Sequence, residues 1–238
     1  MSEQGDDPGR LLTRPEPPAG LRRPNAAAGE PPSSGLQPLG LDEPRDGLLY
    51  VPAGYQRGRA APLVLMLHGA GGDPRGGLDP FLRLADDHGL VLVAPASRRE
   101  TWDRVLGGYG PDVGTVDRAL ARTFGRLDVD RSRLAVAGFS DGASYALSLG
   151  MANGDLFTHV IAFSPGFAAP GSRRGRPRLF VTHGLHDDVL PIAATSRRIL
   201  RDARRDGYDV RYREFDGGHA VPGELAEEAV RWFLEDGG

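Results

Sequence analysis

The segment that points most directly to chemistry is residues 138–142, Gly-Phe-Ser-Asp-Gly, which has the pattern G-x-S-x-G. It follows a short apolar run at Leu134–Ala137 and precedes a run of small and aliphatic residues that begins at Ala143. A strand that turns so sharply into a helix strains the serine backbone, and glycines two residues before and after it avoid clashes. The Ser140 hydroxyl would then stand at a helix N-terminus, where developing negative charge is favoured. The alternative is an ordinary glycine-rich turn.

A second glycine-rich segment, Leu-His-Gly-Ala-Gly-Gly at residues 67–72, also follows an apolar run. In a serine hydrolase, the N–H groups of Ala70 and Asp141 would form an oxyanion hole, and His68 would hold the loop. A P-loop is excluded because it needs a lysine after its glycines, and residues 69–74 do not match the dinucleotide fingerprint G-x-G-x-x-G. A plain tight turn stays open as an alternative.

Composition limits the nucleophiles that this chain can use. The 238 residues include no cysteine, and all 29 basic residues are arginine. Thiol nucleophiles, disulfides, cysteine zinc sites and Schiff-base lysines are therefore excluded. A serine, a threonine, a carboxylate or a metal-bound water remains. The net charge of −3 with mixed signs argues against nucleic-acid binding.

Two further segments carry acids and histidines. Residues 183–191 read His-Gly-Leu-His-Asp-Asp-Val-Leu-Pro, and residues 217–219 read Gly-Gly-His. The order Ser140, Asp187, His219 is one of the three chain orders known for serine triads. A metal held by His183, His186, Asp187 and Asp188 is an alternative for the first segment, but the usual helical or strand-pair framing is missing. We predict no metal and no cofactor.

The chain from residue 47 alternates short apolar runs with amphipathic stretches. Strands are expected at Leu48–Val51, Leu63–Leu67, Leu90–Ala94, Leu134–Ala137, Val160–Phe163, Leu179–Thr182 and Val210–Phe215. Helices are expected at Leu78–His88, Val116–Leu127, Ala143–Met151, Ile192–Arg205 and Glu224–Leu234. This alternation predicts one α/β domain over residues 47–238, with a doubly wound and mostly parallel sheet.

The first 46 residues differ from the rest in composition. Residues 1–40 hold eight prolines and six glycines, and the first aromatic residue is Tyr50. We expect residues 1–46 to be a disordered or loosely packed arm. The arm lacks the apolar core of a secretory signal, and no apolar run is long enough to span a membrane. The expectation is a cytoplasmic protein.

Taken together, the four motifs at residues 67–72, 138–142, 183–191 and 217–219 resemble the α/β-hydrolase superfamily. Within it, the chain is similar to phospholipase/carboxylesterase and polyhydroxybutyrate-depolymerase-like serine esterases, over roughly residues 47–236. The resemblance implies Ser140 as the nucleophile, His219 as the general acid and base, and Asp187 as the orienting acid. It implies carboxylesterase activity on a small-molecule ester. The oligomeric state is not predicted.

Substrate range is a further expectation. Only about fifteen residues separate Phe163 from Leu179, which leaves little room for an apolar lid. We therefore expect a minimal lid or none, and esters of short to medium acyl chains. Trp102 and Tyr109 are candidates for lining the pocket, with simple packing as the alternative. A thioesterase, an acyltransferase, or a non-catalytic protein on the same scaffold are the other functions considered. His88 and His159 are expected at the surface.

Overall fold

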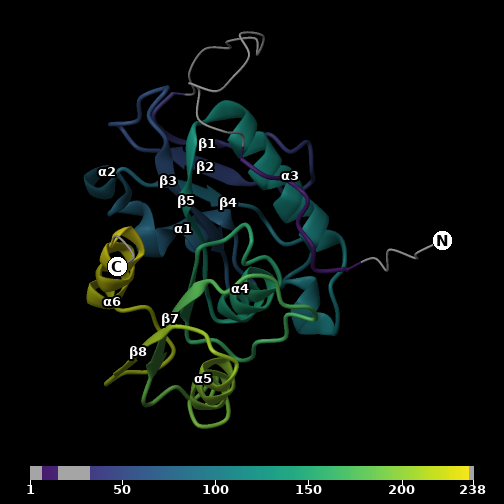
Figure 1. Cartoon of the computed structure of the whole chain (residues 1–238), viewed down its shortest axis with the longest axis vertical. Coiled ribbons are helices and arrows are strands. Elements are labelled where there is room, and N and C mark those ends of the chain that lie inside the picture. Colours follow the sequence, from purple (N-terminus) through teal and green to yellow (C-terminus); the bar gives the residue numbers. More distant parts are fainter. Residues whose placement is uncertain (1–6, 16–32, 236–238) are drawn as a thin grey trace, which may run out of the picture.

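A computed structural model describes residues 7–15 and 33–235 of the chain. Its centre is one sheet of eight strands in the order β1-β2-β4-β3-β5-β6-β7-β8 (Figure 1). The strands are β1 Gly35–Pro38, β2 Leu48–Val51, β3 Ala61–Leu67, β4 Val91–Ala94, β5 Val129–Phe139, β6 His159–Phe163, β7 Arg178–Gly184 and β8 Val210–Phe215. From β4 to β8 all neighbours are parallel, whereas β1 and β2 pair antiparallel at one edge.

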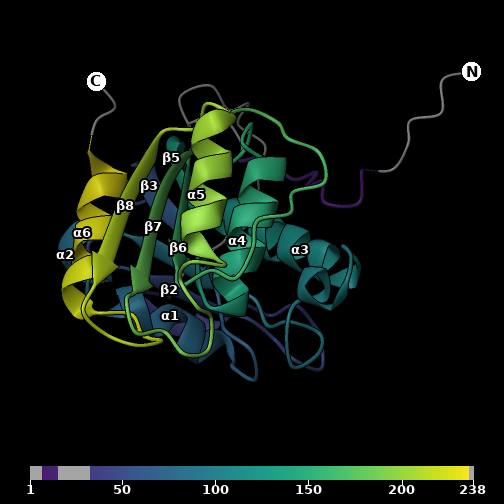
Figure 2. The same ribbon diagram turned by 90° about the horizontal axis from the view of Figure 1, so that it is seen from below.

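Helices cover both faces of this sheet, as Figure 2 shows from below. The helices are α1 Pro74–Leu82, α2 Ala85–His88, α3 Pro111–Arg126, α4 Asp141–Ala152, α5 Ser196–Arg205 and α6 Gly223–Leu234, with a 3₁₀ turn, η2, at Asp103–Leu106. Apolar side chains of α3, α4 and α5 form one core, and those of α1, α2 and α6 form the other. The central strands are therefore buried on both sides, which is why they read as continuous apolar runs. The predicted doubly wound α/β class is confirmed.

The element boundaries differ from the prediction where local sequence was misleading. β5 starts five residues earlier than expected, and the predicted helix at 78–88 is two helices that begin at Pro74. Pro74 follows Asp73, whose side chain accepts the Gly76 N–H at 2.8 Å and caps α1. Between β6 and β7, residues 164–177 contain no helix, in agreement with the expected minimal lid.

The prediction of a loose arm over residues 1–46 is wrong for the parts that the structure describes. Leu11 and Leu39 are fully buried, and β1 extends the sheet beyond β2. The proline and glycine content of these residues gave no indication of such contacts. In the case of Leu11, the partner is more than 100 residues away. Residues 1–6 and 16–32 lie outside the described residues. Among the helices of the described ranges, none has the length and apolar character needed to cross a membrane.

Candidate active site

Three side chains predicted from the sequence meet at the carboxyl edge of the sheet. Ser140 follows β5, Asp187 follows β7 and His219 follows β8. His219 Nε2 lies 2.9 Å from Ser140 Oγ, and His219 Nδ1 lies 2.7 Å from Asp187 Oδ2. The carboxyl ends of parallel strands share one edge, so residues separated by 47 and 32 positions come together there.

Ser140 has the strained backbone that its motif predicts. Its φ of 57° and ψ of −120° are unusual for a residue with a side chain. A Cβ at Gly138 would stand 2.3 Å from the Gly142 carbonyl oxygen, and one at Gly142 would stand 2.1 Å from the Leu67 oxygen. Any side chain at either glycine would collide with backbone, so the turn requires both.

The hydrogen-bond partners show which atoms of Ser140, His219 and Asp187 carry protons. Asp187 has only acceptor oxygens when ionised, so His219 Nδ1 donates to it and His219 Nε2 accepts from the Ser140 hydroxyl. Burial alone would raise the pKa of Asp187, but hydrogen bonds from His219 and from the Leu190 N–H hold that pKa below its ordinary value. The carboxylate is therefore ionised at neutral pH and orients the imidazole.

The loop at residues 68–72 lies directly beside Ser140. A Cβ on Gly69 would stand 3.5 Å from Ser140 Cβ. The Gly71 N–H donates to the Glu100 carbonyl at 2.7 Å. On the other side, Asp141 is the first residue of α4, so its N–H has no acceptor within the helix. Asp141 directly follows Ser140 and Ala70 directly follows Gly69; an oxyanion hole made of their N–H groups stays a prediction.

His68 has the structural position expected for it. Its Nε2 accepts the Ser97 N–H at 3.1 Å, so Nδ1 carries the proton and donates to the Gly69 carbonyl at 2.8 Å. Burial lowers the pKa of His68, which keeps the ring neutral and both bonds intact near pH 7.

One loop connects the two sides of the site, and its role could not be recognised from the sequence. Residues 97–102, here called the bracing loop, contact the loop at 68–72 and also α4. Thr101 Oγ1 donates to the Asp141 carboxylate at 2.6 Å. Arg45 donates to the carbonyls of Gly72, at 2.9 Å, and Arg99, so it ties the two loops together. Only the threonine hydroxyl and the arginine charge signal this role in the sequence, and both residue types are common.

Trp102 packs in the core, which is the alternative to pocket lining that the sequence left open for it. It is 0% exposed, its Nε1 donates to the His68 carbonyl at 2.8 Å, and its ring stacks on Tyr145 with centroids 5.0 Å apart. The ring is buried because it lies beneath the 68–72 loop. Tyr109 is half-buried and lines a hollow of about 550 Å³ with Thr101 and Leu106.

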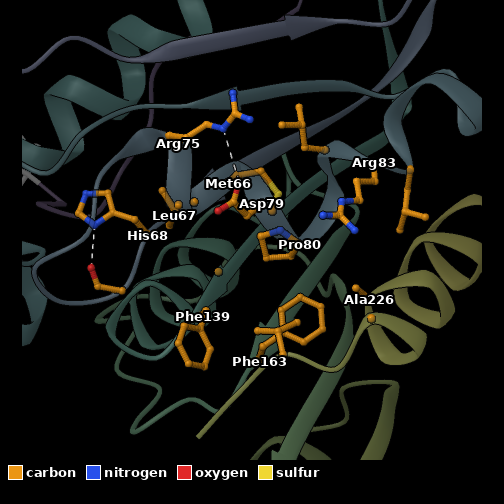
Figure 3. Close-up of a pocket in the computed structure, with 18 residues that line it drawn as sticks. Met66, Leu67, His68, Arg75, Asp79, Pro80, Arg83, Phe139, Phe163 and Ala226 are labelled. Atoms are coloured by element: carbon orange, nitrogen blue, oxygen red, sulfur yellow. Dashed lines mark hydrogen bonds and ion pairs between the residues drawn. The ribbon is translucent and has the colours of Figure 1, made fainter.

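A cavity with a volume of about 680 Å³ lies between α1 and α6 (Figure 3). Its apolar lining includes Phe139 and Phe163, which point into it from β5 and β6. Arg83 lies at the end of α1 on the same cavity. Neither Ser140 nor His219 lines it, but the Phe139 ring packs against His219 with centroids 4.7 Å apart. The cavity is therefore next to the triad, separated from it by Phe139.

The four residues considered as metal ligands either have other hydrogen-bond partners or lie exposed at the surface. His183 is fully buried with both ring nitrogens hydrogen-bonded, and His186 is exposed, with Nε2 2.9 Å from Asp216. Asp188 is also exposed. Within residues 7–15 and 33–235, no three histidine or acidic side chains form a group that could hold a metal ion.

Comparisons with known proteins show what the chain is similar to as a whole. No family model matches the chain. It is 26% identical over 156 residues to feruloyl esterase C of Emericella nidulans, an alignment covering 62% of this chain. The chain spans 57% of that relative's length.

Two solved structures are similar to the whole domain. Esterase PE8 has a TM-score of 0.64 at 23% identity, with 77% of this chain and 95% of that chain covered. An S-formylglutathione hydrolase from Agrobacterium tumefaciens has a TM-score of 0.64 at 16% identity, covering 79% and 88%. The chain therefore has the fold of the α/β-hydrolases.

Proposed function

We propose that this chain, which has the α/β-hydrolase fold, is a serine esterase that cleaves carboxylic esters through Ser140, His219 and Asp187. The observation that carries the proposal is the unbroken hydrogen-bond chain from the Ser140 hydroxyl through His219 to Asp187. Its position on a strained turn at the start of α4 adds support. The similarity to a feruloyl esterase supports an ester as the substrate.

In the first half of the reaction, Ser140 Oγ attacks the ester carbonyl while His219 Nε2 takes its proton. Asp187 keeps the imidazole in the required tautomer and stabilises the imidazolium. The N–H groups of Ala70 and Asp141 hydrogen-bond the tetrahedral oxyanion, an interaction worth about 3–4 kcal/mol per donor in comparable sites. Because the turn and the braced loop fix these donors beforehand, they need no reorganisation during the reaction.

In the second half, the C–O bond to the leaving alcohol breaks and His219 returns the proton to the alkoxide. The acyl group is then held as an ester on Ser140. Water attacks this ester, with His219 accepting one of its protons, and the tetrahedral intermediate collapses to release the acid and restore the Ser140 hydroxyl.

The open surface around the triad supports short to medium acyl chains. Residues 164–177 form no helical lid, and Val189, two residues after Asp187, is 61% exposed. An interfacial lipase would cover such apolar groups until it met a lipid surface. The cavity beside Phe139 offers space for a further part of a small ester.

The proposal is tested by labelling with a fluorophosphonate probe together with steady-state turnover of p-nitrophenyl butyrate. Ser140→Ala should abolish both, since no other group replaces the nucleophile. The matched control is Ser132→Ala, at the other end of β5, where the hydroxyl contacts only Asp130. It should label and turn over like the wild type. Retained turnover in Ser140→Ala would falsify the assignment.

A substrate panel then separates the candidate activities. Acyl esters of increasing length, the matching thioesters, and hydroxyalkanoate oligomers should be compared by kcat/KM. We expect the highest values for esters with two to about eight acyl carbons, a range set by the open site. Faster cleavage of thioesters would favour a thioesterase. A strong preference for emulsified long-chain fat would contradict the open site.

A further inference from the structure

His183 is the buried histidine closest to the proposed triad. It lies near the end of β7, four residues before Asp187, and its side chain is fully buried. Its Nδ1 is 2.6 Å from Ser196 Oγ, and its Nε2 is 2.7 Å from the Leu190 carbonyl oxygen. The same Nε2 is 3.2 Å from Asp187 Oδ2. The mechanism above does not use this ring.

The partners of His183 fix its tautomer. The Leu190 carbonyl only accepts, so Nε2 carries the proton and Nδ1 must accept from the Ser196 hydroxyl. Ser196 is the first residue of α5 and is fully buried, so its hydroxyl has a defined place. Burial lowers the pKa of His183, in agreement with a neutral ring at pH 7.

Both oxygens of the Asp187 carboxylate face hydrogen-bond donors in this arrangement. Its Oδ1 accepts the N–H groups of Val189, at 3.1 Å, and Leu190, at 2.8 Å. Its Oδ2 accepts from His219 and faces the Nε2 proton of His183. Leu190 is therefore held twice, by its N–H on Asp187 and by its carbonyl on His183. Loss of the His183 ring would leave the Leu190 carbonyl with the longer hydrogen bond from Thr195 Oγ1, at 3.5 Å, and would free one side of the carboxylate.

We propose that His183 is a positioning residue for Asp187, and that Ser196 holds His183 in the tautomer this requires. The proposal rests on the proposed function, because Asp187 matters only if His219 activates Ser140. It extends the hydrogen-bond chain from the start of α5 to the nucleophile. Orientation of Asp187, and through it of His219, would then depend on two residues that never touch the substrate.

The first test replaces His183 with methionine, which fills a similar volume without a donor. We expect kcat for p-nitrophenyl butyrate to fall about 10- to 100-fold with KM little changed, because small displacements of reacting groups cost this much. His183→Gln, whose amide can donate near the place of Nε2, should recover a large part of the loss. Ser196→Ala should show a smaller loss of the same kind.

The matched control is His159, a second buried histidine on the neighbouring strand β6. Its Nδ1 contacts Thr158 and its ring packs on Trp232, away from Asp187. His159→Met should therefore lower stability without lowering kcat. Wild-type kcat in folded His183→Met, with Ser140→Ala inactive, would overturn the positioning role and leave the proposed function standing.

A double-mutant cycle distinguishes positioning from general destabilisation. In an Asp187→Asn background, His183→Gln and His183→Met should have no further effect on the rate of fluorophosphonate labelling, because the group they act through is gone. Additive losses would overturn the proposal. If His183→Met does not fold, His183→Gln and Ser196→Ala carry the same comparison.

Discussion

Single residues next to Ser140 hold it in place without touching its hydroxyl. The strain at Ser140 is offset by Gly138 and Gly142, which allow backbone contacts that no side chain would permit. Asp141 has two separate parts to play: its N–H faces the proposed oxyanion position, while its carboxylate accepts from Thr101. The orientation of the first turn of α4 therefore depends on a side chain from the bracing loop.

Thr101→Val tests this dependence with almost no change in volume. We expect kcat to fall about 10-fold, since the substitution leaves the half-buried Asp141 carboxylate without this donor and loosens one proposed oxyanion contact. The free energy of unfolding should fall by about 1 kcal/mol. Both quantities are measured on the same preparation, by ester turnover and by urea titration.

Thr123→Val is the control for this experiment. Thr123 is buried in α3, and its hydroxyl donates to the Ala119 carbonyl of the same helix at 2.8 Å. It should cost a similar amount of stability with no change in kcat. Equal effects of the two valine variants on kcat would remove Thr101 from the site.

Among the elements, the segment at residues 7–15 makes more specific contacts with the domain than its composition indicates. The Leu11 N–H donates to the Asn153 side chain at 2.9 Å, and Asn153 Nδ2 donates to the Gly9 carbonyl at 2.8 Å. Arg10 forms two hydrogen bonds to Asp155, each 2.5 Å long. Hydrogen bonds from Arg10 hold the pKa of Asp155 well below its ordinary value. The segment thus packs beside the end of α4 through specific contacts.

Two adjacent leucines provide a matched test of this packing. Leu11 is 0% exposed and Leu12 is 79% exposed. Leu11→Ala should lower the free energy of unfolding by about 2–4 kcal/mol, because it removes buried methyl groups and leaves a cavity. Leu12→Ala should change it by less than about 0.5 kcal/mol. Urea unfolding of the two variants measures this difference. Equal and small changes in the free energy of unfolding would mean that the segment does not anchor to the domain.

The elements that could be predicted are those whose own sequence sets their pattern. The buried strands at 63–67 and 160–163 are short and apolar throughout, as strands buried on both faces of a parallel sheet are, so length and composition predict their type. β1 and the segment at 7–15 could not be predicted, because each is held by distant partners such as Val51 and Asn153 rather than by local pattern. Proline and glycine content indicated a loose arm, and tertiary contacts overrode it.

The site was predictable to the extent that it depends on short motifs in a fixed order. Ser140, Asp187 and His219 each lie in a segment that contains glycine or proline at characteristic spacings. Trp102 could be assigned neither to a pocket nor to the core, because an aromatic residue on a loop has the same sequence pattern in both places. Thr101, Arg45 and Ser196 were missed because nothing in their own neighbourhood in the sequence reveals a partner up to 54 residues away.

At the scale of the whole molecule, three buried histidines, His68, His159 and His183, have pKa values below the ordinary value of histidine. His159, expected at the surface, is buried against Trp232 and Phe233 on the α6 side of the sheet. Burial, and then the nearby charge of Arg178, lower the pKa of His159 to about 4. Burial also lowers the pKa of His68 and of His183. The unfolded chain therefore takes up protons in a pH range where the folded protein does not.

This difference predicts how stability depends on pH. Above pH 6.5, the ordinary pKa of histidine, the contribution of His159 is fully present; it is lost as pH falls towards 4, because protons then favour the unfolded chain. For His159 alone the loss by pH 4 is about 3 kcal/mol. His159→Phe, which keeps a ring against Trp232, should remove that part of the pH dependence. Urea unfolding at pH 7.5 and at pH 4.5 measures it: the wild type should lose about 2–3 kcal/mol more between the two values than the variant. An equal loss in both proteins would mean that His159 is accessible to protons in the folded state.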